Sequence, residues 1–255
     1  MTRSSVPRSR GQLGGERVPG LRAVHELLTA RTRRVRRLIV STERDRSPLL
    51  DEILDLADDA GVSVERIDAE RVRDEARVEA PQGVVALADP IGPARLDDLL
   101  AHPSAFLVAL DGVTDPRNLG AVLRSAETAG ATGAIVPRHR SALLSPAAVK
   151  AAAGAIEHIP IALVGGVPAA LEQAARADVW TIGLDAAGDT AVFDVDLADR
   201  PLALVFGAEG AGLARLTRDR CDVVARIPMH GQLESLNVSA AAAVACFEIA
   251  RRRAR

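Results

Sequence analysis

Aromatic residues and cysteines are scarce in this sequence of 255 residues. Aromatic side chains make up 2% and tyrosine is absent, so extensive stacking of unpaired bases on aromatic rings is not expected. No CxxC pair and no regularly spaced histidine accompanies Cys221 and Cys246, which argues against a structural zinc site, any other metal centre or a disulfide scaffold.

Long hydrophobic runs are also missing. No apolar run approaches the roughly 20 residues of a membrane span, and the Arg- and Ser-rich start lacks the apolar core of a secretory signal. We therefore expect a cytoplasmic protein with no membrane partner. The composition, 48% hydrophobic and 26% charged, is that of an ordinary globular chain.

Charge is distributed unevenly along the chain. Residues 1–40 contain ten arginines and two glutamates, a net charge of +8. Because the whole chain has a net charge of −2, residues 41–255 carry a net charge of −10. A basic front end on an acidic body suggests a phosphate-rich partner. The alternative is a solvated tail in an arginine-rich protein whose single lysine is Lys150.

The first half of the chain reads as a basic arm followed by a small α/β unit. Residues 1–19 lack apolar periodicity and are predicted to be a flexible arm. Residues 20–88 are predicted to fold into a small α/β unit, and residues 89–104, with their prolines, to form a linker. Within residues 20–88, we predict a helix near 21–28, a strand at 35–40, a helix at 49–60 and strands at 62–67 and 83–88.

Residues 105–255 are predicted to form a second, larger domain. Apolar strand-like runs alternate with helix-like stretches, which is typical of an α/β fold with a mostly parallel sheet covered on both faces. The predicted strands are 106–110, 133–136, 159–164, 179–184, 202–206 and 223–227. Ligands of such sheets bind beyond the carboxyl ends of the strands.

One polar segment follows the predicted strand that ends at Leu110. Asn118 lies where the loop meets the next helix, and Arg124 lies less than two turns later, so both side chains can face a pocket above the strand end. The alternative is that Asn118 caps the helix and Arg124 is solvated on its outer face.

A second segment, Phe206 to Gly212, is a buried strand that opens into a glycine-rich turn containing Glu209. Its glycine order is GxxGxG, whereas a dinucleotide-binding turn needs GxGxxG, which discounts a nucleotide-dependent oxidoreductase. A tight structural turn explains the glycines alone, but not an acid held inside the turn.

A third segment runs from Ile227 and Met229 through Ser235, Leu236 and Asn237 into an alanine-rich helix. Taken alone, Ser235 or Asn237 would simply cap that helix. As in the other two segments, a structural role and a functional role are both open.

Together and in this order, the three segments resemble the signature motifs of the SpoU (TrmH-type) RNA ribose methyltransferases. The resemblance extends from about Leu107 to Ile249. In addition, Gly20 to Leu28 and Pro81 to Ala86 are similar to the amino-terminal RNA-binding domain of the branch that methylates a guanosine of large-subunit ribosomal RNA.

The resemblance implies a deep trefoil knot, a homodimer that completes each active site, and bound S-adenosylmethionine. It implies that backbone groups near Gly207, Ile227 and Leu236 hold this cofactor, with Phe206, Met229 and Ser235 beside it. The catalytic residues carried over are Asn118, Arg124, Glu209, Ser235 and Asn237.

Arg124 is the residue that the resemblance places nearest the 2′-hydroxyl proton, and the family mechanism often makes it the general base. A guanidinium keeps its proton in proteins, because its pKa lies far above neutral pH. We therefore expect Arg124 to clamp a neighbouring phosphate and to stabilise the developing alkoxide, while phosphate or water accepts the proton.

RNA phosphates are expected to contact a run of arginines, which predicts a steep dependence of RNA affinity on salt. These are Arg31, Arg33, Arg34, Arg36 and Arg37. The folded amino-terminal unit favours ribosomal RNA over two alternatives, a tRNA methyltransferase and an antibiotic-resistance enzyme. A catalytically silent RNA-binding or ribosome assembly factor is the non-enzyme alternative, which the intact Asn118, Arg124, Glu209 and Asn237 disfavour.

Overall fold

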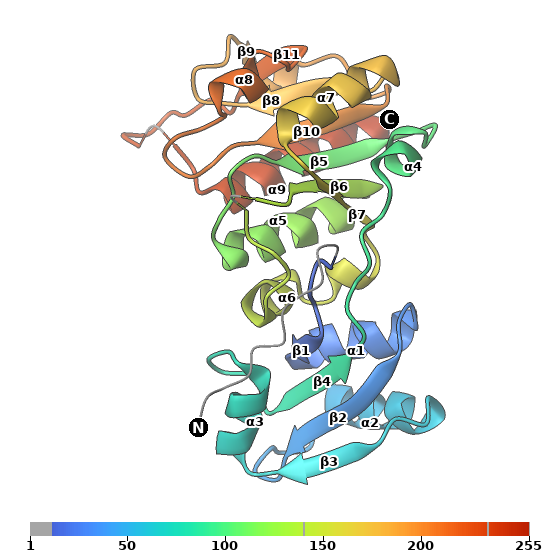
Figure 1. The fold of residues 1–255 in the computed structure, drawn as a ribbon. Coiled ribbons are helices and arrows are strands. Elements are labelled where there is room, and N and C mark those ends of the chain that lie inside the picture. The colour runs from blue at the N-terminus through green and yellow to red at the C-terminus, as the bar shows by residue number, and fades with distance from the viewer. Residues whose placement is uncertain (1–11, 140, 234, 255) are drawn as a thin grey trace.

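The computed structural model describes residues 12–139, 141–233 and 235–254, which form two α/β parts stacked end to end (Figure 1). The amino-terminal part contains a four-stranded sheet of order β1-β4-β2-β3, and the carboxy-terminal part a seven-stranded sheet of order β7-β6-β5-β10-β8-β11-β9. Among the described residues, no helix has the length and apolar character needed to cross a membrane.

The amino-terminal sheet is mixed, because β4 is antiparallel to both β1 and β2 while β2 and β3 are parallel. Its elements are β1 (Arg17–Pro19), α1 (Leu21–Ala30), β2 (Val35–Ser41), α2 (Pro48–Asp59), β3 (Val64–Ile67), α3 (Ala69–Ala76) and β4 (Val84–Ala88). Successive residues of a strand face opposite sides. Leu38 and Val40 therefore share a core with α1 and α2, whereas Ile39 packs with α3.

The prediction that residues 1–19 form a flexible arm is wrong for residues 12–19, which the structure describes. Leu13 is buried, its carbonyl accepts a 3.0 Å hydrogen bond from the amide of Leu144, and Arg17–Pro19 forms β1 against β4. The apolar side chains of Leu13 and Val18 are enough to anchor the segment, because each fills a place in the shared core. Residues 1–11 lie outside the described part of the chain.

All strand pairs of the carboxy-terminal sheet are parallel. Its elements are α4 (Leu96–Leu100), β5 (Phe106–Leu110), α5 (Pro116–Thr128), β6 (Gly133–Pro137), α6 (Pro146–Ala152), the 3₁₀ turn Ala155–Glu157, β7 (Ile161–Val164), α7 (Val167–Arg176), β8 (Trp180–Leu184), β9 (Thr190–Ala191), the 3₁₀ turn Val192–Asp194, β10 (Leu202–Phe206), α8 (Arg215–Arg218), β11 (Val223–Arg226) and α9 (Val238–Arg253). The predicted parallel α/β fold is confirmed, and the trefoil knot stays a prediction.

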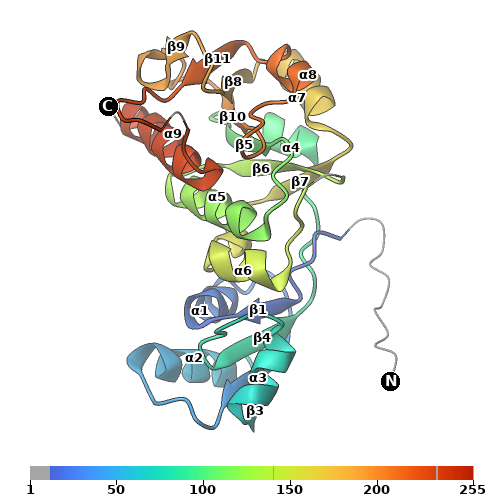
Figure 2. The same cartoon turned by 90° about the vertical axis from the view of Figure 1, so that its left-hand side faces the viewer.

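Helices cover both faces of this sheet (Figure 2). One face, which includes Phe106 and Leu204, packs against α5, α6 and α9, and the other, which includes Leu107 and Val205, packs against α4 and α7. The chain order reverses beside β5, since β6 and β7 lie on one side of it and β10, β8 and β11 on the other. Such a switch point is where open α/β sheets bind ligands.

The two parts are joined by a buried ion pair. Arg33 donates hydrogen bonds to both carboxylate oxygens of Glu157, at 2.9 and 2.6 Å, and also to the carbonyls of Gly15 and Asp89. The predicted linker, residues 89–104, is folded too, because it contains α4 with Leu99 and Leu100 buried against the large sheet. The junction is therefore a packed interface.

Candidate active site

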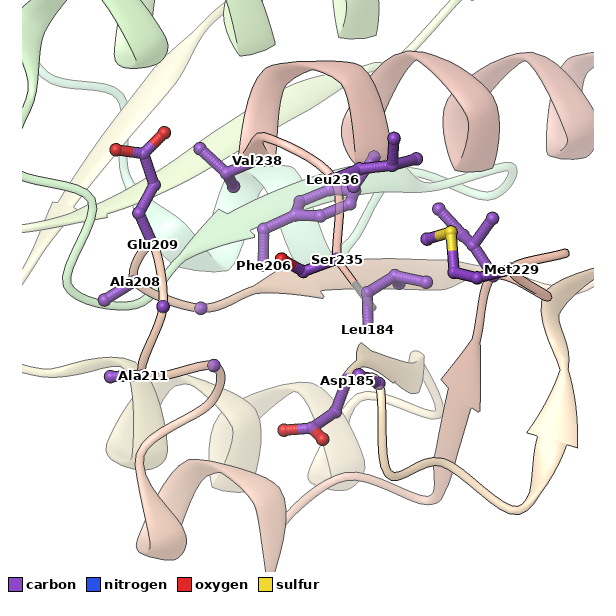
Figure 3. A pocket seen from close by; sticks show the side chains of 16 residues that line it. Leu184, Asp185, Phe206, Ala208, Glu209, Ala211, Met229, Ser235, Leu236 and Val238 are labelled. Atoms are coloured by element: carbon purple, nitrogen blue, oxygen red, sulfur yellow. The ribbon is translucent and has the colours of Figure 1, made fainter. Parts of the chain in front are cut away.

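A pocket opens at the carboxyl ends of β8, β10 and β11 (Figure 3). Its walls come from three chain segments, all of which follow strands of the large sheet. The lining residues are Leu184, Asp185 and Ala186, then Phe206 to Gly212, then Ile227, Met229, Ser235, Leu236, Val238 and Ala241. The six residues predicted to surround the cofactor, Phe206, Gly207, Ile227, Met229, Ser235 and Leu236, all lie here.

The glycine-rich turn folds back tightly on itself. The amide of Ala208 donates to the carbonyl of Gly212 at 3.0 Å, and the amide of Gly212 donates to the carbonyl of Ala208 at 3.0 Å. A Cβ atom on Gly207 would lie 2.1 Å from the backbone of Gly212, so only glycine permits this approach. Gly210 and Gly212 have positive φ angles of 72° and 66°. At its three glycines, the turn thus presents bare backbone to the pocket.

Apolar side chains stand exposed at the pocket mouth. Met229 is 37% and Leu236 is 43% exposed, and Phe206 lies at the back of the pocket. Large apolar side chains left in solvent beside a concave, partly polar surface are typical of a small-molecule site. An adenine ring needs apolar walls and backbone partners, and a sulfonium is complementary to a carboxylate. The pocket offers apolar walls in Phe206 and Leu236, and carboxylates in Asp185 and Glu209.

Beside the pocket, three polar side chains from distant segments form one hydrogen-bonded cluster. Glu209 Oε1 accepts from Asn118 Nδ2 at 2.8 Å and from Asn237 Nδ2 at 2.5 Å. Asn237 Nδ2 also lies 3.2 Å from Asn118 Oδ1. Glu209, which the resemblance carries over as a catalytic residue, thus holds two asparagines.

The two asparagines differ in their local roles. Asp115 is the N-cap of α5, since its Oδ1 accepts from the amide of Arg117 at 2.8 Å, so the capping interpretation of Asn118 is wrong. Asn237 is the N-cap of α9 and accepts from the amide of Ser239 at 2.8 Å. Its oxygen caps the helix while its nitrogen binds Glu209, so the two interpretations of Asn237 are compatible.

Arg124 lies away from this cluster, which corrects the expectation that it shares a pocket with Asn118. Asn118 is buried at the start of α5, whereas Arg124 is exposed and lines hollows between α5, α6 and the amino-terminal part. Six positions of an α-helix turn the side chain about 240° from its starting direction. Within one chain, Arg124 therefore faces away from the cofactor pocket.

Three of the five arginines predicted to bind RNA have carboxylate partners. The Arg33 side chain is 7% exposed and is held by Glu157, Arg36 pairs with Asp89 at 2.7 Å, and Arg37 pairs with Glu65 at 2.8 Å. Arg31 and Arg34 are exposed. The prediction that Arg33 binds RNA is therefore wrong. Its guanidinium is buried against Glu157, where a phosphate cannot reach it, and it connects the two parts of the protein instead.

Sequence reasoning missed Asp185 and its neighbours in the pocket wall. Asp185 follows β8, pairs with Arg218 at 3.3 Å and accepts from the amide of Ala187 at 2.9 Å. One signal was present in the sequence, because Asp185 directly follows the predicted strand 179–184. That this strand lies next to the one ending at Phe206 is known only from the structure, so the sequence did not place Asp185 beside the glycine-rich turn.

The cysteines take no part in the pocket. Burial raises the pKa of Cys246 to about 12, and burial followed by the charges of Asp222 and Asp111 raises the pKa of Cys221 to about 12. Both are therefore protonated and unreactive near neutral pH. In the described ranges, no group of three His, Cys, Asp or Glu side chains is arranged to hold a metal ion.

Two family models match the chain. The SpoU rRNA Methylase family matches residues 105–247, and the family described as RNA 2′-O ribose methyltransferase substrate binding matches residues 17–94. Together they span both sheets of the structure.

Named relatives and solved structures match over nearly the whole chain. The 23S rRNA (guanosine-2′-O-)-methyltransferases RlmB of Pseudomonas putida and Haemophilus influenzae are 41% and 39% identical, over 93% of this chain and 97% and 98% of theirs. An AdoMet-bound rRNA methyltransferase from Sinorhizobium meliloti has a TM-score of 0.76 and 27% identity, over 92% of this chain and 87% of that one. The AdoMet complex of the SpoU methyltransferase AviRb from Streptomyces viridochromogenes has a TM-score of 0.76 and 29% identity, over 93% and 90%.

Proposed function

Because this chain belongs to the SpoU rRNA Methylase family, we propose that it methylates the ribose 2′-hydroxyl of a guanosine in 23S ribosomal RNA. It is an RNA 2′-O-methyltransferase that depends on S-adenosylmethionine. One observation carries the proposal: Glu209 both lines the cofactor pocket and accepts hydrogen bonds from Asn118 and Asn237, so the cluster predicted to be catalytic lies against the pocket.

The pocket residues fit S-adenosylmethionine in shape and charge. Leu184, Phe206 and Leu236 offer apolar surface for the adenine, and the backbone of Gly207 and Ile227 offers hydrogen-bonding groups. When bound, the cofactor supplies a methyl group on a positively charged sulfur. With the cofactor in place, the ribose 2′-hydroxyl would receive that methyl group and would give up its proton to phosphate or water.

The protein's contribution is to hold the reactants in line and to stabilise negative charge on the ribose oxygen. Asn118 and Asn237 are held rigidly by Glu209 and orient the ribose, while Ser235, exposed at the pocket, hydrogen-bonds near the cofactor. Arg124 stabilises the alkoxide from a second copy of the chain. That role requires a homodimer, because Arg124 faces away from the pocket of its own chain.

Subunit mixing tests this arrangement. Arg124→Ala lacks the arginine and Gly207→Val lacks a working pocket, so each is expected to be inactive alone. If the active site is shared, mixed dimers contain one intact site, and an equimolar mixture recovers about a quarter of the wild-type rate. A mixture that stays inactive after proven subunit exchange contradicts the shared site.

The reaction itself is tested with radiolabelled S-adenosylmethionine and, separately, protein-free 23S ribosomal RNA and bulk tRNA. We expect label in a guanosine ribose of 23S RNA with the wild-type protein and none with Arg124→Ala. Label in tRNA alone contradicts the proposal that 23S RNA is the substrate. If the protein binds the cofactor but transfers no label to either RNA or to ribosomal precursor particles, the proposed methylation is contradicted and an RNA-binding factor is favoured. A ribosomal substrate also implies action in the cytoplasm.

A further inference from the structure

A second hollow lies where the two parts of the protein meet, on the side where Arg124 is exposed. Five segments surround it: the end of β1 with the start of α1, the start of α2, the turn before β4, the middle of α5 and the end of α6. Its polar lining consists of Arg22, Gln82, Arg124 and Lys150. The amino-terminal motifs that begin at Gly20 and Pro81 thus meet at one place, next to the proposed catalytic arginine.

The charges in this hollow are uncompensated. In the part of the chain that the structure describes, the guanidinium groups of Arg22 and Arg124 have no hydrogen-bond or ion-pair partner, and no acidic residue lines the hollow. Lys150 Nζ donates to the carbonyls of Glu79 and Ala80, at 3.0 and 2.7 Å, which leaves its charge without a carboxylate. Arg33, Arg36 and Arg37, by contrast, are neutralised by carboxylates.

The hollow is also preorganised. The bonds of Lys150 fix the turn before β4 to α6, and Gln82 Oε1 accepts from the amide of Leu21 at 3.1 Å. Gln82 itself has a positive φ of 60°, and Gly20 has a φ of 102° that favours glycine. A ligand entering here meets positive charge whose supporting backbone is already in place.

The surface on the other side of Arg124 has the opposite character. It is lined by Glu26, Glu127 and His158, and His158 Nε2 lies 3.0 Å from Glu26 Oε2. Arg124 therefore lies at the border between a basic hollow and an acidic one. A polyanion is attracted to the side of Arg22 and Lys150 and repelled from the side of Glu26 and Glu127.

We propose that the hollow lined by Arg22, Arg124 and Lys150 binds the phosphate groups of the RNA strand that flank the target ribose. Arg22 and Lys150 contact phosphates, and Arg124 extends from the same surface toward the ribose. The inference rests on the proposed function, since RNA methylation is what makes an RNA backbone the occupant. It moves the expected RNA contacts from Arg33, Arg36 and Arg37 to this junction.

The test compares Arg22→Gln with Arg46→Gln, both in the full-length protein. Each variant removes one positive charge from an exposed position of the amino-terminal part, but Arg46 is 84% exposed, pairs with Asp51 and lies outside the hollow. Binding of a 23S RNA fragment is measured by fluorescence anisotropy from 50 to 300 mM KCl, alongside the KM for RNA, kcat and S-adenosylmethionine binding.

We expect Arg22→Gln to raise the KM for RNA about tenfold and to lower the slope of log affinity against log salt by about 0.7–0.9, as for one lost phosphate contact. kcat at saturating RNA and cofactor binding stay within twofold of wild type, and Arg46→Gln matches wild type throughout. Arg22→Glu is expected to weaken RNA binding further.

Equal salt slopes for wild type, Arg22→Gln and Arg22→Glu overturn the inference while leaving methylation, and hence the proposed function, intact. If no RNA is methylated, the proposed function fails, but the salt slopes still test the hollow: a shallower slope for Arg22→Gln alone supports it. Equal loss of slope in Arg46→Gln overturns it, because the effect is then general charge.

Discussion

Asn118 and Asn237, 119 positions apart in the chain, donate to the same carboxylate oxygen of Glu209, at 2.8 and 2.5 Å. Asn118 comes from the first turn of α5 and Asn237 from the N-cap of α9, two helices that pack on the same face of the sheet. Glu209 therefore connects the glycine-rich turn with both helices. Moving any one of the three displaces the other two.

Replacing Asn237 with serine separates its two roles. Serine still caps α9 but is too short to reach Glu209, so we expect near-wild-type thermal stability and a kcat about 10–100-fold lower. Asn237→Ala loses the cap as well and is expected to be about 1 kcal/mol less stable than Asn237→Ser. Wild-type turnover in Asn237→Ser would show that the bond to Glu209 has no role in the reaction.

Gly207 and Gly210 form a matched pair for testing the pocket. A Cβ on Gly207 would overlap the backbone of Gly212, whereas a Cβ on Gly210 meets no atom within 4 Å and suffers only from its φ of 72°. We expect Gly207→Ala to weaken S-adenosylmethionine binding at least about 100-fold, measured by calorimetry, because the turn must open. Gly210→Ala should lose about 1 kcal/mol of folding stability and keep its affinity within a few-fold. Equal affinities would contradict the role of the tight turn.

The buried Arg33–Glu157 ion pair lies outside the cofactor pocket, and breaking it is expected to lower the stability of the fold. Arg33→Met leaves the Glu157 side chain, 1% exposed, without its partner, so the free energy of unfolding in urea should fall by about 3–5 kcal/mol. Arg36→Met breaks an exposed pair with Asp89 and should lower it by less than about 1 kcal/mol.

A double variant decides why Arg33→Met is destabilised. Arg33→Met with Glu157→Gln removes the buried charge and should recover part of the loss. No recovery would mean that the hydrogen bonds of Arg33 to the carbonyls of Gly15 and Asp89, rather than the ion pair, stabilise the interface between the two parts.

Glu248 on α9 predicts an acid-dependent stability. Hydrogen bonds from Arg251 and Arg252, the bond from Arg251 first, lower the pKa of this buried carboxyl to about 2, despite the opposing effect of burial. Since the folded-state pKa is below the unfolded value of about 4.3, the stabilisation is complete above pH 5 and is lost as the pH falls from about 4 to 2.

Glu248→Gln should therefore lower stability at neutral pH and flatten the acid limb of the stability curve. Between pH 4 and 2, the slope of unfolding free energy against pH should decrease by up to about 1.4 kcal/mol per pH unit. Denaturant titrations at several pH values measure this. An unchanged acid limb would assign the sensitivity to other carboxylates.

The elements that sequence reasoning recovered are those whose signal is local. The predicted strands 106–110 and 202–206 coincide with β5 and β10, because a fully buried parallel strand is a continuous apolar run between polar turns. α3 was missed, since it has eight residues and is mostly charged, so it shows little apolar periodicity. β1 was missed because three residues become a strand only when β4 pairs with them.

The candidate site divides in the same way. Motif order predicted the pocket around Gly207, Ile227 and Leu236 and the members of the Asn118 cluster, but not which partner each side chain takes. Arg33 and Arg22 are both arginines of the same basic front end, yet one is buried against a carboxylate 124 positions away and the other faces an open hollow.

By itself, the sequence determined the α/β class, the position of most strands and the family to which the motifs belong, because these depend on residues close together in the chain. Only the tertiary structure decided that Arg124 and Asn118 face different surfaces, that Arg33 is an anchor, and that Arg22, Arg124 and Lys150 share one hollow. Side-chain pairing and charge compensation depend on distances in space, and packing of the two parts sets those distances.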